Sequence, residues 1–550
     1  MRATHLSLLI ALLLCACGGG GGGTDAGGPV SDGLPGVTDS TVYSSDANAS
    51  LPGAVEAAAV SAQTLSANGQ TLSYTATAGH LIARDGSGAA EASVFYVAYT
   101  VPGNDAAARP VTFFYNGGPG SASVWLQLGS YGPKRVNWAG GTSNPLMDNP
   151  EHLLGQSDLV FINAVGTGYS QAIAPFSNRS FWSVDKDAEL FRDFIQRYIA
   201  ANNRAASPKY LYGESYGGPR TAVLARRLQE AGVMLDGLVL QSPIMNYNSN
   251  CTVVRTQHCA GYLPSYAAVG AWHQLTRPAP TDLNTWAAQA RSYADGTYTP
   301  AVQAFMATGE QAPALGQPLA DLTGLPASRW QASLNVYADD FQRWLVSGYT
   351  LDRYDGRTKT AVGGGGGGGA PSPFETGIAI HLRDHLNYRN GSTYVIQGSA
   401  IDSWDFSHAG RALPDTVPDL TAALAQNPRL RVLSISGYHD LATPFHVTES
   451  DLARVGASRV RIRNYSGGHL SYLDDSSRAQ QHADLKAFYA DTLAVRATVD
   501  LGPERRALTA TIPAIDRAGT PQRPGSVAPK MEPAFQSVQR DPWVPPSTPR

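Results

Sequence analysis

The sequence predicts an α/β fold in which a central sheet of mostly parallel strands gathers functional residues along one edge. Short apolar runs, each followed by a loop, are typical of buried parallel strands, and they occur at residues 111–115, 159–163, 238–241, 430–434 and 460–464. Polar residues suited to catalysis directly follow several of these runs. Ligands of open α/β sheets bind outside the carboxyl ends of the strands, so these residues are expected to share one site.

The remaining elements are predicted from changes of pattern along the chain. Residues 70–99 alternate in polarity around a turn-rich stretch, which predicts an antiparallel β meander. Residues 209–212 predict a strand, and the apolar periodicity of residues 219–232 predicts the helix that follows it. These segments place the main α/β domain at residues 61–243 and 395–500.

Residues 244–394 are expected to form an inserted, mainly helical cap. They contain tryptophan- and tyrosine-rich helical stretches at 285–307 and 329–346, with no comparable ladder of strands. Seven consecutive glycines at 363–369 cannot bury apolar surface and predict a disordered surface loop. The proline-rich segment 501–550 predicts an extended tail.

The N-terminus is typical of an exported protein. The apolar stretch from Leu6 to Leu14 has the length of a signal-peptide core and is too short to span a bilayer. Residues 14–18 resemble a bacterial lipobox, which predicts a signal peptide at 1–17 and lipidation of Cys17; ordinary secretion with cleavage nearby is the alternative. Residues 18–60, which open with a glycine run, are expected to be a flexible tether.

The expected location is therefore the bacterial outer membrane or periplasm, with membrane attachment through Cys17 rather than through a transmembrane helix, or else secretion. In such an oxidising compartment, Cys251 and Cys259 are expected to form a local disulfide. A reactive or metal-binding pair is disfavoured, because only His258 lies nearby as a further ligand.

Charge and motif content exclude several classes of function. A net charge of −3, with only 15% charged residues, gives no electrostatic footprint for nucleic acid. The glycine runs lack the context of a nucleotide-binding loop, and the sequence shows neither a metal-ligand cluster nor a cofactor fingerprint. We therefore expect neither a cofactor nor a metal.

Ser215 is the candidate nucleophile. It lies in the G-x-S-x-G pattern of residues 213–217, between a predicted strand and a predicted helix. Glycines on either side permit the tight turn that exposes a serine hydroxyl at such an elbow. A glycine-rich structural loop is the alternative interpretation.

A serine nucleophile needs a base and an orienting carboxylate, which in α/β-hydrolases follow it in the order acid, then base. Asp440 follows the run at 430–434, and His469 follows the run at 460–464, so these two residues fit best. The weaker candidates are His439 and His446 for the base, and Asp405, Asp474 and Asp475 for the acid.

The oxyanion hole requires two backbone N–H groups. Tyr216, directly after the serine, is expected to supply one of them. Gly118 is expected to supply the other, because residues 116–120 (Asn-Gly-Gly-Pro-Gly) follow a predicted strand and their glycines let a backbone amide approach the substrate. A simple turn is the alternative for this segment.

Five ordered motifs resemble those of the serine carboxypeptidase family. They are residues 116–120, residues 165–170, residues 213–218, the Asp440 loop and Gly468–His469, and the resemblance extends over about residues 60–495. The glutamate directly before the nucleophile separates this family from most lipases and esterases. The resemblance implies an α/β-hydrolase fold.

The resemblance also implies an activity, the removal of C-terminal residues from peptides or proteins through an acyl-enzyme on Ser215. It implies that groups matching Asn116, the Gly117 amide and Glu214 bind the free carboxylate of the substrate. Glu214 must be protonated to donate to a carboxylate.

The chain departs from the family pattern at two positions. Ser130 stands where the family has a second glutamate, which shares a proton with the glutamate that matches Glu214. Because this partner is missing, Glu214 loses a reason to stay protonated, and we hypothesise activity less confined to acidic pH. Ser121 stands where a cysteine often follows the Asn-Gly-Gly-Pro-Gly motif. An esterase or acyltransferase of the same fold is the alternative function, followed by a non-catalytic surface lipoprotein.

Overall fold

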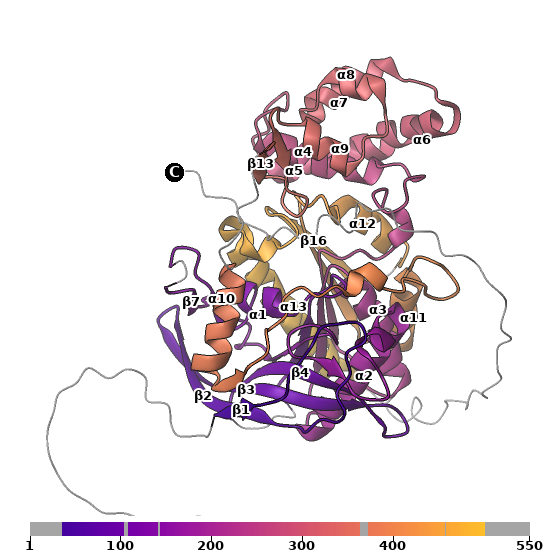
Figure 1. Ribbon diagram of the computed structural model, residues 1–550. Helices are drawn as coiled ribbons and strands as arrows, with labels where there is room; N and C mark the ends of the chain where they lie inside the picture. Colours follow the sequence, from indigo (N-terminus) through magenta and orange to yellow (C-terminus); the bar gives the residue numbers. More distant parts are fainter. Residues whose placement is uncertain (1–35, 104–107, 141–142, 364–371, 457, 501–550) are drawn as a thin grey trace, which may run out of the picture.

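The computed structural model of the chain describes residues 36–103, 108–140, 143–363, 372–456 and 458–500 (Figure 1). The signal peptide with Cys17, residues 364–369 of the glycine run and the tail at 501–550 lie outside the described residues. What the sequence predicts for them stays a prediction.

A 10-stranded sheet forms the centre of the molecule. Six of its strands are parallel, from β8 through β5, β10, β11 and β15 to β16, and β2, β3 and β4 extend the sheet with antiparallel pairs. The short β9 (Gln171–Ala172) pairs with β4. In spatial order the other strands are β16 (Val460–Tyr465), β15 (Arg431–Gly437), β11 (Gly237–Gln241), β10 (Lys209–Glu214), β5 (Val111–Tyr115), β8 (Asp158–Ile162), β4 (Ala90–Thr100), β3 (Gln70–Arg84) and β2 (Ala58–Ala67).

Every strand predicted for the parallel sheet is present, and the α/β-hydrolase fold is confirmed. The predicted meander is also present, but β2 was missed. Its ten residues are mainly alanine and serine, with only two β-branched residues, Val60 and Thr64, and no aromatic residue, so the usual strand pattern is weak.

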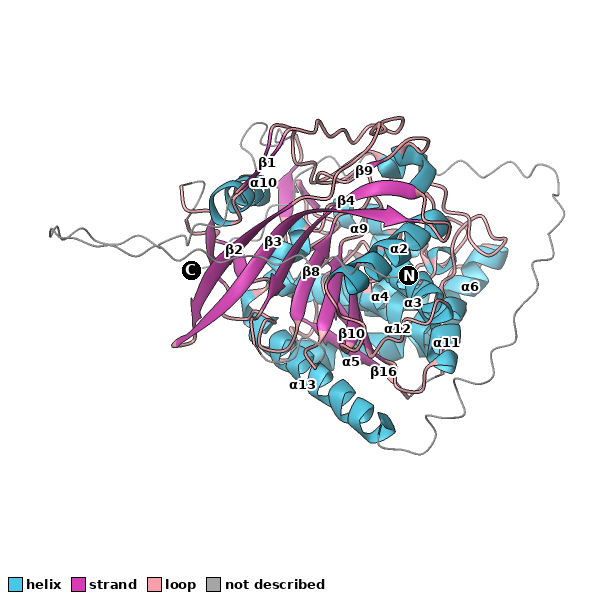
Figure 2. Cartoon of the chain, turned by 90° about the horizontal axis from the view of Figure 1, so that it is seen from below, coloured by secondary structure: helices cyan, strands magenta, loops and turns pink. Residues whose placement is uncertain are grey.

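Helices cover both faces of the sheet, as the alternation of side chains along each strand requires. Leu211 of β10 packs with α2 (Val184–Ala201), α3 (Gly217–Glu230) and α11 (Val417–Gln426). Its neighbours Tyr210 and Tyr212 point the other way, toward α1 (Val124–Gly129), α10 (Pro373–Ile380) and α13 (Asp475–Asp500). Figure 2 shows α2, α3 and α11 gathered on one side of the strands.

A helical lobe lies beyond one end of the sheet, above α12 (Phe445–Ala453) and β16 in the view of Figure 1. It has a core of its own, in which Tyr266 and Phe341 stack with their ring centroids 4.0 Å apart and Trp330 is fully buried. A disulfide between Cys251 and Cys259 lies in this core. The lobe consists of α4 (Leu263–Trp272), α5 (Leu283–Tyr293), α6 (Thr299–Thr308), α7 (Gly316–Thr323), α8 (Ala327–Ala332), α9 (Ala338–Trp344) and the hairpin of β12 (Tyr349–Leu351) and β13 (Lys359–Ala361).

Two boundaries differ from the predicted ones. The expected cap extended to residue 394, but α10 and β14 (Tyr388–Asn390) pack on the central sheet, where Phe374 and Tyr388 join its core. The expected tether extended to residue 60, but β1 (Val37–Asp39) pairs in parallel with β14, and Leu51 is buried. Both segments are short and irregular, so their tertiary contacts, rather than any sequence period, hold them on the sheet.

A further short hairpin, β6 (Lys134–Val136) with β7 (Leu146–Asp148), follows α1. In the described part of the chain, no helix combines the length and apolar character needed to cross a membrane.

Candidate active site

Ser215 lies on a tight turn between β10 and α3, with a left-handed backbone at φ +60°. Its N–H donates to the Gln241 carbonyl at 2.9 Å. The flanking glycines are required, because a Cβ on Gly213 would lie 2.2 Å from the Gly217 oxygen, and one on Gly218 would lie 2.5 Å from Pro243. Ser215 is partly exposed whereas the residues on either side of it are buried, so the turn presents the hydroxyl to the site.

The structure brings His469 and Asp440 together at the ends of β16 and β15. The Asp440 Oδ2 atom lies 2.7 Å from His469 Nδ1. The carboxylate also accepts hydrogen bonds from the N–H groups of Ala442 and Thr443 at 2.7 and 3.0 Å, and from the Thr443 hydroxyl at 2.7 Å. Asp440 is also fully buried. A buried carboxylate with several hydrogen-bond donors is what the orienting acid of a serine hydrolase requires.

The electrostatics favour an imidazole that accepts a proton. Burial lowers the pKa of His469, and the adjacent Asp440 carboxylate raises it. The effect of Asp440 is the larger one once its charge and its hydrogen bond are combined, so the net shift of the pKa is upward. Because Nδ1 is bonded to Asp440, Nε2 is the nitrogen that remains for the serine. Within the described residues no hydrogen bond joins the Ser215 hydroxyl to His469, and in free enzymes such contacts often tighten only when substrate binds.

The glycine loop after β5 lies directly against the elbow. A Cβ on Gly117 would lie 2.5 Å from both the Glu214 oxygen and the Tyr216 nitrogen, so only glycine permits this approach. Gly118 has φ +101°, which side chains rarely adopt. Across the described part of the chain, neither the Gly118 N–H nor the Tyr216 N–H has a hydrogen-bond acceptor, so both donors remain for a ligand.

Glu214, Asn116 and Gly117 meet beside the serine. The Asn116 side-chain amide donates to Glu214 Oε1 at 2.8 Å, and the Tyr472 hydroxyl donates to Glu214 Oε2 at 2.6 Å. Glu214 is 4% exposed, and burial raises its pKa to about 7. The carboxyl group is therefore partly protonated at neutral pH.

The two residues that depart from the family pattern have other partners. Ser130 ends α1 and is fully buried, with its hydroxyl donating to the Leu126 carbonyl at 2.6 Å. The Ser121 hydroxyl donates to Gln397 Oε1 at 2.7 Å, and the Gly398 N–H donates to the Gly120 carbonyl at 2.7 Å. Two hydrogen bonds thus connect residues 397–398 to the glycine loop at residues 116–121.

The rival candidates for base and acid have structural partners elsewhere. Burial lowers the pKa of His439 to about 3, so this residue stays neutral. His446 lies between Glu449 and Asp295, at 2.8 and 2.9 Å. Asp474 pairs with Arg357, Asp475 lies 3.4 Å from Arg135, and the Asp405 carboxylate accepts the Ser407 N–H at 2.9 Å.

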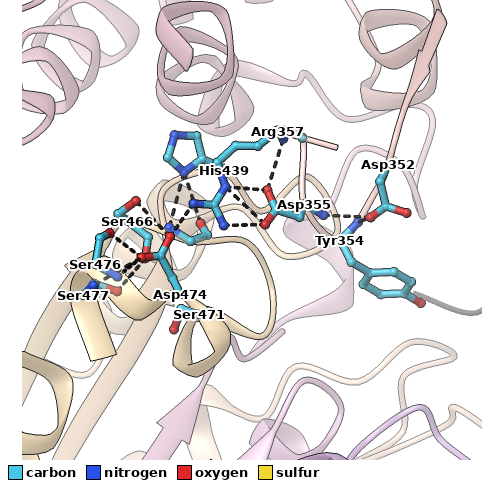
Figure 3. A network of polar contacts seen from close by, with 12 residues as sticks. Asp352, Tyr354, Asp355, Arg357, His439, Ser466, Ser471, Asp474, Ser476 and Ser477 are labelled. Atoms are coloured by element: carbon cyan, nitrogen blue, oxygen red, sulfur yellow. Dashed lines mark hydrogen bonds and ion pairs between the residues drawn. The ribbon is translucent and has the colours of Figure 1, made fainter. Parts of the chain in front are cut away.

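A loop of the helical lobe, residues 352–358, packs against the loops that carry Asp440 and His469 (Figure 3). The Tyr354 carbonyl accepts the His469 N–H at 2.6 Å, and the Arg353 carbonyl accepts the Leu441 N–H at 3.1 Å. A Cβ on Gly468 would lie 2.3 Å from the Tyr354 oxygen.

Arg357 anchors this loop. Its guanidinium donates to Asp355 at 2.6 Å and also pairs with Asp474, which follows His469 in the chain. All three side chains are buried or nearly so, and the guanidinium carbon lies over the Trp272 ring, 5.1 Å from the ring centroid. The lobe therefore contributes to holding the loop that carries His469 in place.

The sequence interpretation missed Thr443, Tyr472 and the loop at 352–358. Thr443 and Tyr472 each follow a predicted catalytic residue by three positions, a spacing that one turn brings close, and this was the available signal. The loop gave no local signal, because it lies far from Asp440 and His469 in the sequence. Among the described residues, no group of three or more His, Cys, Asp or Glu side chains is arranged to hold a metal ion, and the absence of a cofactor stays a prediction.

The sheet order, the serine elbow and the His469–Asp440 pair are those of an α/β-hydrolase. Residues 67–273 match the family model described as serine carboxypeptidase. This segment of the chain is therefore similar to the serine carboxypeptidase family.

Part of the chain is also similar to a curated protein. Serine carboxypeptidase-like 36 of Arabidopsis thaliana is 27% identical over 159 residues, which are 28% of this chain and 31% of the relative. The chain thus matches about a third of the length of that relative.

Among solved structures, Kex1(delta)p of Saccharomyces cerevisiae, a prohormone-processing carboxypeptidase, aligns with a TM-score of 0.49 and 14% identity, over 76% of this chain and 91% of that chain. A proline iminopeptidase of Mycobacterium smegmatis aligns with a TM-score of 0.35 and 16% identity, over 78% of this chain and 98% of that chain.

Proposed function

We propose that this protein is an exported serine carboxypeptidase that hydrolyses C-terminal peptide bonds through an acyl-enzyme on Ser215. The single observation that supports this most is the placement of Glu214. A buried carboxyl group with a pKa raised to about 7 by burial lies next to the nucleophile and is bonded to Asn116. A hydrolase of neutral esters has no need for a protonated acid at this position, whereas recognition of a substrate carboxylate does.

In the proposed complex, the substrate carboxylate accepts hydrogen bonds from protonated Glu214, from the Gly117 N–H and from the second amide hydrogen of Asn116. The Asn116 amide donates only one of its hydrogens to Glu214, so the other remains for the ligand. Fixing the carboxylate there places the last peptide bond of the substrate at Ser215.

The chemistry then follows in two stages. Ser215 Oγ attacks the carbonyl carbon while its proton passes to His469 Nε2, and the oxyanion accepts hydrogen bonds from the Gly118 and Tyr216 N–H groups. Cleavage of the C–N bond passes that proton to the leaving amine, which departs as a free amino acid. Water, deprotonated by His469, attacks the acyl-enzyme and returns Ser215 to its hydroxyl form.

The test is incubation of the purified protein with an unblocked peptide and analysis of the products by mass spectrometry. We expect stepwise loss of residues from the C-terminus only, and no loss with Ser215→Ala. Cleavage of acyl esters without any C-terminal ladder would instead support the esterase or acyltransferase alternative and contradict this proposal.

We also propose that the protein is exported and that a lipid on Cys17 attaches it to a membrane. Besides the leader sequence, the buried Cys251–Cys259 disulfide favours an oxidising compartment. Mass spectrometry of the protein from its native membrane fraction tests this proposal: an acylated N-terminal Cys17 is expected, and an unmodified N-terminus at another residue would contradict lipidation.

A further inference from the structure

The hydroxyl of Tyr472 is the second fixed partner of Glu214. Tyr472 lies in η8 (Ser471–Leu473), three residues after His469, and is fully buried. Its hydroxyl lies 2.6 Å from Glu214 Oε2 while Asn116 holds Oε1 at 2.8 Å. Each oxygen of this carboxyl group therefore has its own side-chain partner.

The surroundings fit the Tyr472 ring closely. Gly129, at the end of α1, leaves room for the ring, because a Cβ there would lie 2.9 Å from Tyr472 Cε2. The next residue, Ser130, turns its hydroxyl away to the Leu126 carbonyl. The buried guanidinium of Arg478 donates to the Gly129 carbonyl at 2.8 Å and also to the carbonyls of Ser130 and Tyr472, which joins the two segments.

We infer that Tyr472 is a positioning residue for recognition of the substrate carboxylate: its hydroxyl is a permanent donor to Glu214 and leaves the carboxyl proton of Glu214 for the substrate. This inference rests on the proposed carboxypeptidase function. In this role the Tyr472 hydroxyl is the partner of Glu214, whereas the Ser130 hydroxyl donates to the Leu126 carbonyl.

The chemistry of the pair supports this role. A carboxyl oxygen has two lone-pair sites, so Glu214 can accept from Tyr472 and Asn116 and still bear a proton. A second carboxylate in the same place would compete for that proton. A phenol does not, because burial and the nearby Glu214 raise the pKa of Tyr472 well above its ordinary value. Glu214 then titrates without a second acid that shares its proton.

The direction of the effect on Glu214 follows from the groups that face it. Burial raises its pKa, Asp440 raises it further, and His469 and the hydrogen bonds from Tyr472 and Asn116 lower it. Tyr212, on the same strand, stays neutral because burial raises its pKa well above the ordinary value. Removing the Tyr472 hydroxyl therefore raises the pKa of Glu214, so that the carboxyl group keeps its proton to higher pH.

The test compares Tyr472→Phe with the wild-type enzyme on a blocked dipeptide with a free C-terminus, with KM and kcat measured from mildly acidic to mildly alkaline pH. For the wild type, KM is expected to rise as Glu214 loses its proton. For Tyr472→Phe, the midpoint of that rise is expected to move upward by roughly one pH unit, since a hydrogen bond to a charged group has about that effect. Ionisation of His469 is expected to act on kcat, so measuring kcat and KM separately distinguishes its effect from that of Glu214.

Two further variants make the result decisive. Tyr465→Phe removes a phenol that donates to Asp484 at 2.6 Å, so it loses a similar hydrogen bond and should leave the midpoint of KM unchanged. Glu214→Gln supplies an amide donor at every pH and should abolish the rise in KM. An unchanged midpoint in Tyr472→Phe, with a flat profile in Glu214→Gln, would overturn the role of Tyr472 alone. A persisting rise in Glu214→Gln would overturn the carboxylate recognition by Glu214 as well.

Discussion

At the scale of single residues, Asp440, the proposed orienting acid, has a partner for each of its carboxylate oxygens. Asp440 accepts two backbone N–H donors and the Thr443 hydroxyl in addition to its contact with His469. The contact of Asp440 Oδ2 with Nδ1 favours the tautomer of His469 with its proton on Nδ1.

Asp440→Asn is therefore expected to keep the fold and lose most of the activity. An asparagine amide that donates to Nδ1 places the imidazole proton on the wrong nitrogen, and kcat should fall by about 10³–10⁴-fold. Steady-state kinetics and a thermal unfolding curve check this prediction. A fall of less than about tenfold with an unchanged unfolding midpoint would exclude Asp440 as the orienting acid.

Activity on free-acid peptides is expected to extend to neutral pH. Below the raised pKa of His469 the base is protonated, so kcat/KM rises with pH until that proton is lost. Above a pH of about 7, Glu214 loses the proton that the substrate carboxylate requires, so kcat/KM falls again. A pH profile of kcat/KM tests this, and an optimum confined to strongly acidic pH would contradict it.

At the scale of elements, the loop at residues 352–358 links the helical lobe to the loops that carry Asp440 and His469. Arg357 connects Asp355 of this loop with Asp474, which lies five residues after His469 in the chain. Removing the guanidinium leaves two carboxylates of low exposure without their partner.

Arg357→Leu is expected to lower the free energy of unfolding by about 3–5 kcal/mol, because it removes one member of a buried ion pair. It is also expected to lower kcat, because the loop that carries His469 loses support. Arg343→Ala is the matched control, since Arg343 is half exposed and pairs with Asp339 and Asp340 on the surface of the same lobe. Its expected cost is below about 1 kcal/mol. Equal stability and activity of the two variants would refute the anchoring role.

At the scale of the whole molecule, the sequence predicts the parts that depend on local pattern. The parallel strands are apolar on both faces and end at loops with candidate catalytic residues, so periodicity and motif order together predict Ser215, Asp440 and His469. The same pattern separated the helical lobe from the sheet.

Contacts between segments that are distant in the sequence could not be predicted from local pattern. Whether α10 belonged to the lobe or to the sheet depended on the packing of Phe374 against the central core, and the pairing of β1 with β14 joins segments more than 300 residues apart. The partner of Glu214 was likewise Tyr472, 258 residues away in the chain. Such contacts leave no local period, so they appear only in the folded molecule.

The most direct test of the central claim is the ratio of kcat/KM for one peptide as its free acid and as its C-terminal amide, at mildly acidic pH. The amide removes the negative charge that Glu214, Asn116 and Gly117 are proposed to bind. Loss of two charge-assisted hydrogen bonds predicts a preference of about 10²-fold or more for the free acid. Equal values for the two substrates would show that the site does not recognise a C-terminal carboxylate and would contradict the proposed carboxypeptidase function.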